Sequence, residues 1–221
     1  MSADNIAALG DPHAGAPTLR AGAPLPEARS AMIMLHGRGA TAESILSLAA
    51  EFRVPGVAYI APQAAGNAWY PLSFLAPLER NEPFLTSALA TVSRAVAAVE
   101  AAGIPSERTF LLGFSQGACL ASEWVARNAR RYGGLFALSG GLIGDDQAPR
   151  DYPGNLAGTP AFLGCSDVDA HVPASRVEET GRILTELGAV VDLRLYRGMG
   201  HTVNADEIEA VVGVLEAAAV G

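Results

Sequence analysis

TFLLGFSQGA, residues 109–118, is the stretch that decides the fold. An apolar run typical of a strand is followed at once by Gly-Phe-Ser-Gln-Gly (113–117) and then by helical spacing of apolar residues. A strand can pass into a helix this sharply only if the residues two before and two after the central serine are nearly without side chains. Gly113 and Gly117 meet that requirement around Ser115. The stretch therefore predicts a strand, a tight turn and a helix, with the Ser115 hydroxyl above the carboxyl edge of a sheet.

On both sides of this unit, apolar runs of strand length alternate with stretches of helical periodicity. The runs are bounded by glycine or proline, as buried strands are, and cover residues 31–37, 56–62, 109–115, 135–141, 160–166 and 191–198. Apolar residues three and four apart predict helices at residues 41–51, 83–102, 116–131, 174–187 and 205–219. Strands separated by helices in this way predict a mostly parallel sheet with helices on both faces, a three-layer α/β fold.

Length and composition indicate one folded domain. The 221 residues are 50% hydrophobic and 17% charged, with too little glycine and proline for a low-complexity chain. Residues 26–221 are therefore predicted to form a single α/β domain. Residues 1–25 are rich in Ala, Gly and Pro without periodicity, so we expect a mobile leader that ends in a short edge strand near residues 18–21.

Charge, hydropathy and cysteine content exclude several classes of partner. The net charge is −8, without a basic block, so the surface repels nucleic acid and anionic lipid. No apolar run approaches the roughly 18 residues that span a bilayer, and the N-terminal sequence lacks the pattern of an export signal. We therefore expect a cytoplasmic protein without membrane insertion. Cys119 and Cys165 are expected to be two buried thiols, with a single disulfide as the alternative.

Two predicted connections, residues 66–82 and 141–159, are longer than such a sheet requires, and loops of this length are often functional. The first contains Trp69, Tyr70 and Phe74 close together. Aromatic side chains gathered on a loop can bind a ligand or pack against the domain itself, and the sequence leaves both interpretations open.

A serine hydroxyl is a poor nucleophile at neutral pH, so Ser115 needs a base and an orienting carboxylate. The chain offers four histidines. We expect His13, in the leader, to be solvated and His36, at the end of a strand, to hold a turn. His201 lies in the glycine-flanked sequence GMGHTV after the last predicted strand, where serine, acid and histidine follow in chain order. His201 is therefore the predicted base, with His171 as its competitor.

The acid should follow a strand between the serine and the histidine. Asp167 and Asp169 both come directly after the run PAFLGCS (160–166), and spacing alone does not choose between them. Together with His171 they could also suggest metal ligands. Nothing else in the chain completes such a set, so no metal site is predicted.

An oxyanion needs one amide from the residue after the nucleophile and one from a loop after an earlier strand. Gln116 supplies the first. The second is predicted at Arg38, because the glycines of His-Gly-Arg-Gly (36–39) let the backbone turn inward. The same turn could suggest phosphate binding, but it lacks the dinucleotide pattern and the lysine and serine of a P-loop.

Four of these motifs together resemble those of a known group of enzymes. LHGRG (35–39), GFSQGA (113–118), DVDAHVP (167–173) and GMGHT (198–202) are similar in order and spacing to the α/β-hydrolases that include bacterial carboxylesterases, lysophospholipases and acyl-protein thioesterases. The similarity covers nearly the whole chain beyond about residue 28. It implies an α/β-hydrolase fold without a large lid domain, and an enzyme that needs no cofactor.

The resemblance also implies roles for particular residues. It implies Asp169 as the acid, because the acid of the family stands four residues before the proline that here is Pro173. It further implies Ser115 and His201 as the other catalytic residues, the oxyanion amides of Arg38 and Gln116, and a substrate contact at Trp69. The aromatic cluster of the same loop adds Tyr70 and Phe74 as predicted substrate contacts. The implied reaction is hydrolysis of short- to medium-chain carboxylic esters through an acyl-enzyme on Ser115.

Three positions depart from the acyl-protein thioesterases. Arg38 stands where they have an apolar residue, Tyr70-Pro71 replaces Phe-Asp, and Leu163-Gly164 replaces His-Gly. These changes flank the predicted pocket and favour small esters over lipidated proteins. The alternatives are an acyl-protein thioesterase or lysophospholipase with the same triad, and an inactive binding protein that uses the aromatic loop. The expected partner is a small ester, and the sequence leaves a homodimer open.

Overall fold

The computed structural model describes residues 10–220, which contain a seven-stranded sheet in the order β1-β3-β2-β4-β5-β6-β7. The strands are β1 (Thr18–Gly22), β2 (Ser30–Leu35), β3 (Val57–Pro62), β4 (Thr109–Phe114), β5 (Gly134–Leu138), β6 (Pro160–Ser166) and β7 (Val190–Tyr196). All neighbouring strands are parallel except β1, which pairs antiparallel with β3 at one edge. The prediction of a mostly parallel sheet is confirmed.

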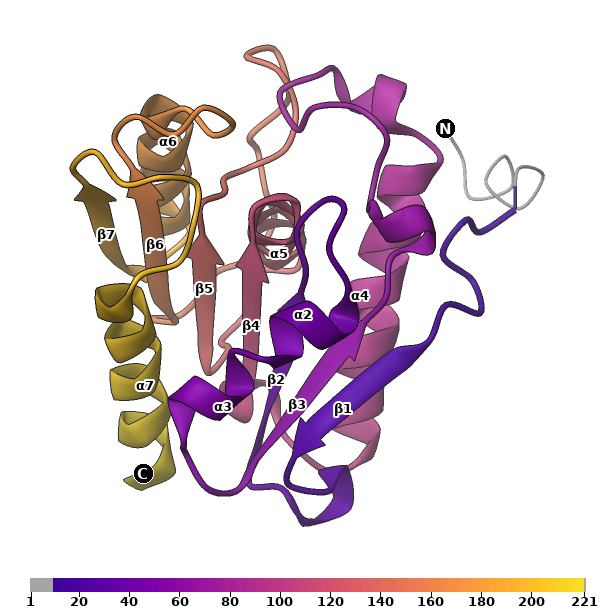
Figure 1. Cartoon of the computed structure of the whole chain (residues 1–221), viewed down its shortest axis with the longest axis vertical. Helices are drawn as coiled ribbons and strands as arrows, with labels where there is room; N and C mark the ends of the chain where they lie inside the picture. The colour runs from indigo at the N-terminus through magenta and orange to yellow at the C-terminus, as the bar shows by residue number, and fades with distance from the viewer. Residues whose placement is uncertain (1–9, 221) are drawn as a thin grey trace.

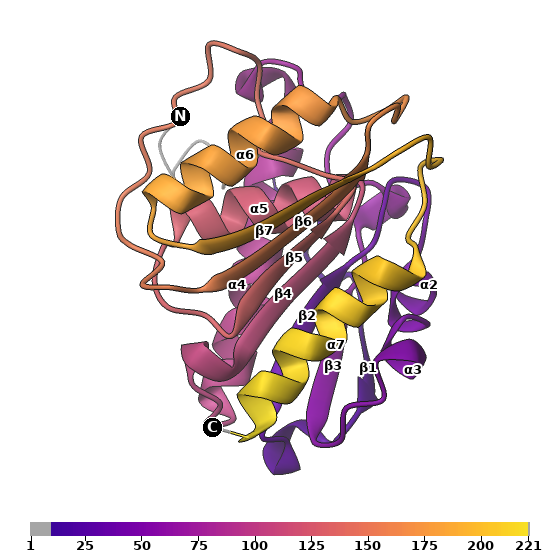
Figure 2. The ribbon, with the colours of Figure 1, turned by 90° about the vertical axis from the view of Figure 1, so that its left-hand side faces the viewer.

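Helices cover both faces of the sheet. They are α2 (Ala42–Leu46), α3 (Ala49–Phe52), α4 (Phe84–Ala101), α5 (Gln116–Arg127), α6 (Ala174–Glu186) and α7 (Ala205–Val220). Short 3-10 turns lie at Leu25–Glu27, Ala65–Asn67, Leu78–Asn81 and Ser106–Arg108. Helices α4, α5 and α6 pack on one face, and α2, α3 and α7 on the other (Figures 1 and 2). The predicted three-layer α/β fold is confirmed.

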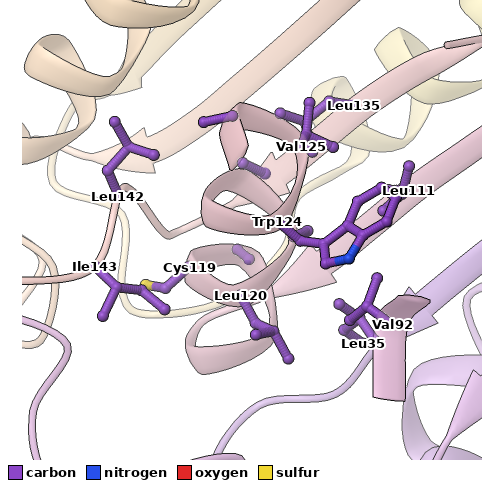
Figure 3. Packing of buried hydrophobic residues seen from close by; sticks show 14 of the residues in the cluster. Leu35, Val92, Leu111, Cys119, Leu120, Trp124, Val125, Leu135, Leu142 and Ile143 are labelled. Carbon is purple, nitrogen blue, oxygen red and sulfur yellow. The ribbon is translucent and has the colours of Figure 1, made fainter. Parts of the chain in front are cut away.

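The core lies on both faces of the central strands because their side chains alternate between the two layers. The neighbours Leu111 and Leu112 on β4 enter opposite hydrophobic clusters. Figure 3 shows the first cluster, in which Trp124 and Leu120 of α5 lie toward Leu35 of β2 and Val92 of α4. The serine-bearing turn is therefore built on two elements that are buried on all sides.

Helix α4 departs from the hydropathy expectation. By length and composition alone, its 18 residues are long and apolar enough to cross a membrane, and it is the one such helix within residues 10–220. Leu85, Val92 and Val96 on this helix are buried in the first cluster. A helix that covers a parallel sheet presents a wide apolar stripe, which explains its hydropathy. The prediction that no apolar segment approaches this length was wrong.

Of the predicted leader, residues 1–9 lie outside the described part, while residues 10–25 include the strand β1 and two buried residues, His13 and Leu25. The strand β1 forms the expected edge strand. His13 is 2% exposed and is not solvated as predicted. Its Nε2 donates to the carbonyl of Trp69 at 2.9 Å, and its Nδ1 accepts from the amide of Ala65 at 3.0 Å. These partners are more than 50 residues away in sequence, where no local pattern indicates them.

Candidate active site

Ser115 stands on the sharp turn between β4 and α5. Its backbone has φ 55° and ψ −119°, a conformation that residues with side chains adopt rarely. A Cβ atom on Gly113 would lie 2.2 Å from the carbonyl oxygen of Gly117, so the strand and the helix can meet only where glycine is present. The amide of Ser115 donates to the carbonyl of Leu138 on β5 at 2.9 Å. The predicted turn is thus present, and it is fastened to the neighbouring strand.

The carboxyl ends of β4, β6 and β7 bring three distant residues together. Nε2 of His201, in the loop after β7, lies 2.8 Å from Oγ of Ser115. Nδ1 of the same ring lies 2.6 Å from Oδ2 of Asp169, in the loop after β6. Phe114 packs against the ring of His201 with a centroid distance of 4.9 Å. One continuous chain of hydrogen bonds therefore joins a carboxylate, an imidazole and a hydroxyl.

Asp169 is held as an ionised acceptor. Its side chain is fully buried, which opposes ionisation, but the hydrogen bond with His201 and the backbone amides of His171 and Val172 outweigh this effect. The two amides donate to Oδ1 at 2.8 and 3.0 Å. Together these donors lower the pKa of Asp169 below its ordinary value. The carboxylate therefore remains an acceptor that fixes the orientation of the imidazole.

The two competitors from the sequence occupy other positions. Oδ1 of Asp167 accepts from the amide of Gly198 at 2.8 Å and thereby ties the loop after β6 to the loop after β7. His171 lies edge-on against the ring of His201, with centroids 4.8 Å apart. Of the two aspartates, Asp169 is the one hydrogen-bonded to His201, and of the two histidines, His201 is the one hydrogen-bonded to Ser115.

The turn after β2 lies beside the serine. A Cβ atom on Gly37 would lie 3.4 Å from Cβ of Ser115, so the backbone of Arg38 follows directly at the site. Gln116 is the first residue of α5, where backbone amides have no partner within the helix and the helix dipole is positive. Arg38 and Gln116 thus belong to two segments that lie beside Ser115, and the assignment of their amides to an oxyanion hole stays a prediction.

The side chain of Gln116 has a role that the sequence did not indicate. Its Oε1 accepts from the amide of Trp69 at 2.9 Å, and its Nε2 donates to the carbonyl of Tyr70 at 2.8 Å. The residue that offers an amide to the site therefore also anchors the aromatic segment next to it. Its partners are 46 and 47 residues away, so no local motif could have revealed the contact.

A cavity of about 660 Å³ opens above the serine. Its lining includes Arg38, Tyr70, Phe74, Ser115, His171 and His201. Tyr70 and Phe74 line the cavity, although the side chain of Tyr70 is almost wholly buried, and their contact with substrate stays a prediction. The cavity is formed between the segments that follow β2, β3 and β4 and the loops after β6 and β7, all at the upper edge of the sheet in Figure 1.

Trp69 was wrongly predicted to contact substrate. Its side chain is 0% exposed and does not line the cavity. Its indole N–H donates to the carbonyl of His36 at 2.8 Å, and its ring packs against His36 and His13 with centroid distances of 5.0 and 5.6 Å. A large aromatic ring with a satisfied N–H is more stable in the interior than on the loop surface. Trp69 therefore supports the site from below.

His36 holds its turn, as expected. Its Nδ1 donates to the carbonyl of Gly37 at 2.8 Å, and its Nε2 accepts from the amide of Ala64 at 3.1 Å. Burial lowers the pKa of His36, so the ring is neutral and can make both contacts at once. Cys119 and Cys165 are free, buried thiols, so the disulfide alternative does not apply.

The fold and this constellation define an α/β-hydrolase. The chain belongs to the phospholipase/carboxylesterase family, whose sequence model matches residues 21–218. The crystal structure of a phospholipase/carboxylesterase from Dyadobacter fermentans is 46% identical, with a TM-score of 0.88, and the match covers 91% of this chain and 97% of that one. Acyl-protein thioesterase 1 from Saccharomyces cerevisiae is 26% identical over 220 residues, covering 90% of this chain and 96% of the relative.

A further structural comparison concerns the fold alone. The crystal structure of acyl-protein thioesterase 2 from Zea mays has 20% identity and a TM-score of 0.71, over 92% of this chain and 99% of that one. The arrangement of strands and helices is therefore shared by relatives of very different sequence. Membership in the family makes this protein a hydrolase of the esterase and thioesterase type.

Proposed function

We propose that the protein is a serine carboxylesterase that hydrolyses short- to medium-chain carboxylic esters through an acyl-enzyme on Ser115. The observation that carries the proposal is the hydrogen-bonded chain from Ser115 through His201 to Asp169, with distances of 2.8 and 2.6 Å, at the floor of an open cavity. A serine needs this support because its hydroxyl alone is a weak nucleophile.

The first half of the reaction forms the acyl-enzyme. Nε2 of His201 takes the proton of the Ser115 hydroxyl as its oxygen attacks the ester carbonyl carbon. The amides of Arg38 and Gln116 donate to the oxyanion of the tetrahedral intermediate, and one such donor typically contributes about 3 kcal/mol. Asp169 holds the proton on Nδ1 and stabilises the imidazolium. The ring then protonates the departing alcohol, and the acyl group remains on the serine.

The second half releases the acid. Water enters the position that the alcohol has left, and His201 removes one of its protons as the oxygen attacks the acyl carbon. The second tetrahedral intermediate collapses, the proton returns to the serine oxygen, and the carboxylic acid leaves. Every proton transfer uses the same imidazole, so no cofactor takes part in the proposed cycle.

The size of the cavity supports the proposed range of substrates. A volume of about 660 Å³ accommodates a small ester, and its walls include the apolar side chains of Leu72, Phe74 and Val172. These walls suit an acyl group of a few carbons. The proposed partner is a small-molecule ester in the cytoplasm, where the free thiols of Cys119 and Cys165 remain reduced.

A thioesterase is the second candidate. The similarity to acyl-protein thioesterase 1 of yeast, which spans 90% of this chain, favours it. The same serine, base and amides would serve, because a thioester carbonyl passes through the same kind of intermediate. Paired esters and thioesters of increasing acyl length distinguish the candidates. A steep rise of kcat/KM toward long thioesters would favour the thioesterase.

The test of the main proposal is the replacement Ser115→Ala, assayed with p-nitrophenyl acetate and butyrate. We expect hydrolysis to fall to the background of the uncatalysed reaction, while circular dichroism shows an unchanged fold. Activity close to that of the unaltered protein would refute the proposed role of Ser115.

A further inference from the structure

Arg38 gives the cavity a positive charge that the proposed hydrolysis does not require. Only its backbone amide belongs to the proposed oxyanion hole, yet its exposed side chain also lines the cavity. Its Nη1 donates to the carbonyl of Pro71 at 2.8 Å, and its Nη2 donates to the carbonyl of Leu72 at 2.5 Å. The guanidinium carbon lies 6.0 Å from the centroid of the Tyr70 ring. The charge is therefore held in one place at the cavity wall.

No carboxylate neutralises this charge within residues 10–220. Both hydrogen bonds of the guanidinium there go to neutral carbonyl oxygens, which occupy two of its five N–H donors. An arginine fixed in this way keeps donors free for a further acceptor, and a planar carboxylate matches their geometry.

The rest of the lining carries no charge that opposes the guanidinium. Apart from Arg38 the cavity is lined by neutral or apolar side chains and by His171 and His201, and no aspartate or glutamate lines it among the described residues. Asp169 lies behind His201 with a fully buried side chain and is already engaged by that ring. In a chain with 23 acidic and 15 basic residues, the cavity has the opposite charge to the protein as a whole. A cleft of one sign attracts ligands of the other.

We propose that the cavity selects esters that carry a carboxylate, with the side chain of Arg38 as the specificity-determining group. The substrates are monoesters of short dicarboxylic acids: the ester carbonyl sits at Ser115 while the free carboxylate reaches the guanidinium. Water cleaves the acyl C–O bond through the acyl-enzyme, and the products are an alcohol and a dicarboxylate. This inference rests on the proposed function and adds the class of substrate.

The experiment compares two esters of nearly equal shape. Monoethyl glutarate carries a free carboxylate, and ethyl glutaramate carries a neutral carboxamide in its place. We expect the unaltered protein to prefer the carboxylate by about tenfold in kcat/KM, since one charge-assisted contact at a half-open site is of this size. Added salt should reduce the preference, because it screens an exposed charge.

Substitutions assign the preference to one side chain. In Arg38→Gln the ratio of the two kcat/KM values should fall about fivefold or more, while Arg38→Lys keeps part of it. Because the ratio compares two esters in the same variant, it cancels any loss of activity that affects both esters, such as a loss caused by displacement of residues 71–72. Arg80→Gln is the control, because it removes an equal charge from the 66–82 connection that Arg38 contacts, at an exposed residue that does not line the cavity. For Arg80→Gln, the ratio of the two kcat/KM values should stay within twofold of the ratio for the unaltered protein.

The outcomes separate this inference from the proposed function. A ratio of one or less in the unaltered protein, or a preference that neither salt nor Arg38→Gln reduces, would overturn the role of Arg38. The proposed function would still stand if ethyl glutaramate were cleaved and Ser115→Ala abolished that cleavage. Undiminished cleavage of both esters by Ser115→Ala would overturn the proposed function and this inference with it.

Discussion

Gly117 lies directly against the backbone of Leu35, so that a Cβ atom on the glycine would fall 2.0 Å from the carbonyl oxygen of Leu35. Leu35 is the last residue of β2, and Gly117 is in the first turn of α5. The contact brings the turn with the proposed oxyanion amide of Arg38 against the helix that begins at Gln116. This close approach links the fold to the site.

The replacement Gly117→Ala should therefore be severely destabilising. The added methyl group meets backbone atoms, which cannot move aside as a flexible side chain could. We expect a loss of about 3 kcal/mol or more in the free energy of unfolding, measured by urea denaturation. Gly213→Ala is the control, because a Cβ atom on that glycine of α7 meets nothing within 4 Å. A loss at Gly117 no larger than at Gly213 would contradict the packing described.

The two aspartates of the 167–173 loop should behave differently. Asp169→Asn should lower kcat by about a thousandfold or more, because the amide cannot hold His201 in the required tautomer. Asp167→Asn is the matched control, since among the described residues that side chain accepts from the amide of Gly198 and does not contact His201 through a hydrogen bond. We expect it to change kcat by less than about fivefold. Equal losses from both replacements in an esterase assay would contradict the assignment of Asp169.

Replacements of Trp69 and Phe74 should affect different properties of the protein. Trp69→Ala should reduce stability by about 3–5 kcal/mol, because it leaves a cavity and frees the carbonyl of His36. The order of preference among acyl chain lengths should remain, since Trp69 does not line the cavity. Phe74→Ala should instead shift that preference toward longer chains, because Phe74 forms part of the wall. A change in chain-length preference for Trp69→Ala alone would contradict these placements.

Glu207 should make stability depend on pH. It is buried in the first turn of α7, and burial raises its pKa to about 7 from an ordinary value of 4.5. Between pH 4.5 and 7 the folded protein keeps the proton that the unfolded chain has released. The free energy of unfolding should therefore fall as pH rises through this range, by about 1.4 kcal/mol per pH unit at most. Above pH 7 this contribution becomes constant.

Glu207→Gln tests that contribution. Oε2 of Glu207 accepts from the amide of Asn204 at 2.9 Å, and a glutamine oxygen can replace it. Oε1 has no partner within residues 10–220 and lies under Gly164. Urea unfolding at pH 5, 6 and 7 should show a smaller decline in stability for the variant than for the unaltered protein. Parallel curves for the two proteins would show that Glu207 does not titrate in this range.

The sequence was sufficient for features that depend on local pattern. Gly113, Ser115 and Gly117 predict their turn because strand, turn and helix are contiguous, and the periodicity on both sides predicts the layers. The choice between Asp167 and Asp169 needed coordinates or the resemblance. Both follow β6 at the sheet edge, and only the position of the loop after β7 decides which one meets His201.

The errors concern burial by distant parts of the chain. His13 was predicted to be solvated because it lies in a segment without periodicity, and Trp69 was predicted to contact substrate because of the resemblance, with packing against the domain left open for its loop. In the structure Trp69 packs on both His13 and His36, across sequence separations that periodicity does not reach. A loop becomes part of the core when a second segment of the chain packs over it. The local sequence of the loop does not indicate that this second segment is there.

The most direct measurement of the central claim is covalent labelling of Ser115. The protein is treated with a fluorophosphonate, and residual esterase activity is followed together with the labelled fraction found by peptide mass spectrometry. Activity should fall in proportion to the labelled fraction, and the label should lie on Ser115. The variant Ser115→Ala should not be labelled, and Asp169→Asn should be labelled far more slowly than the unaltered protein. Full activity in a protein labelled at Ser115, or complete inactivation by a label at another residue, would contradict the account.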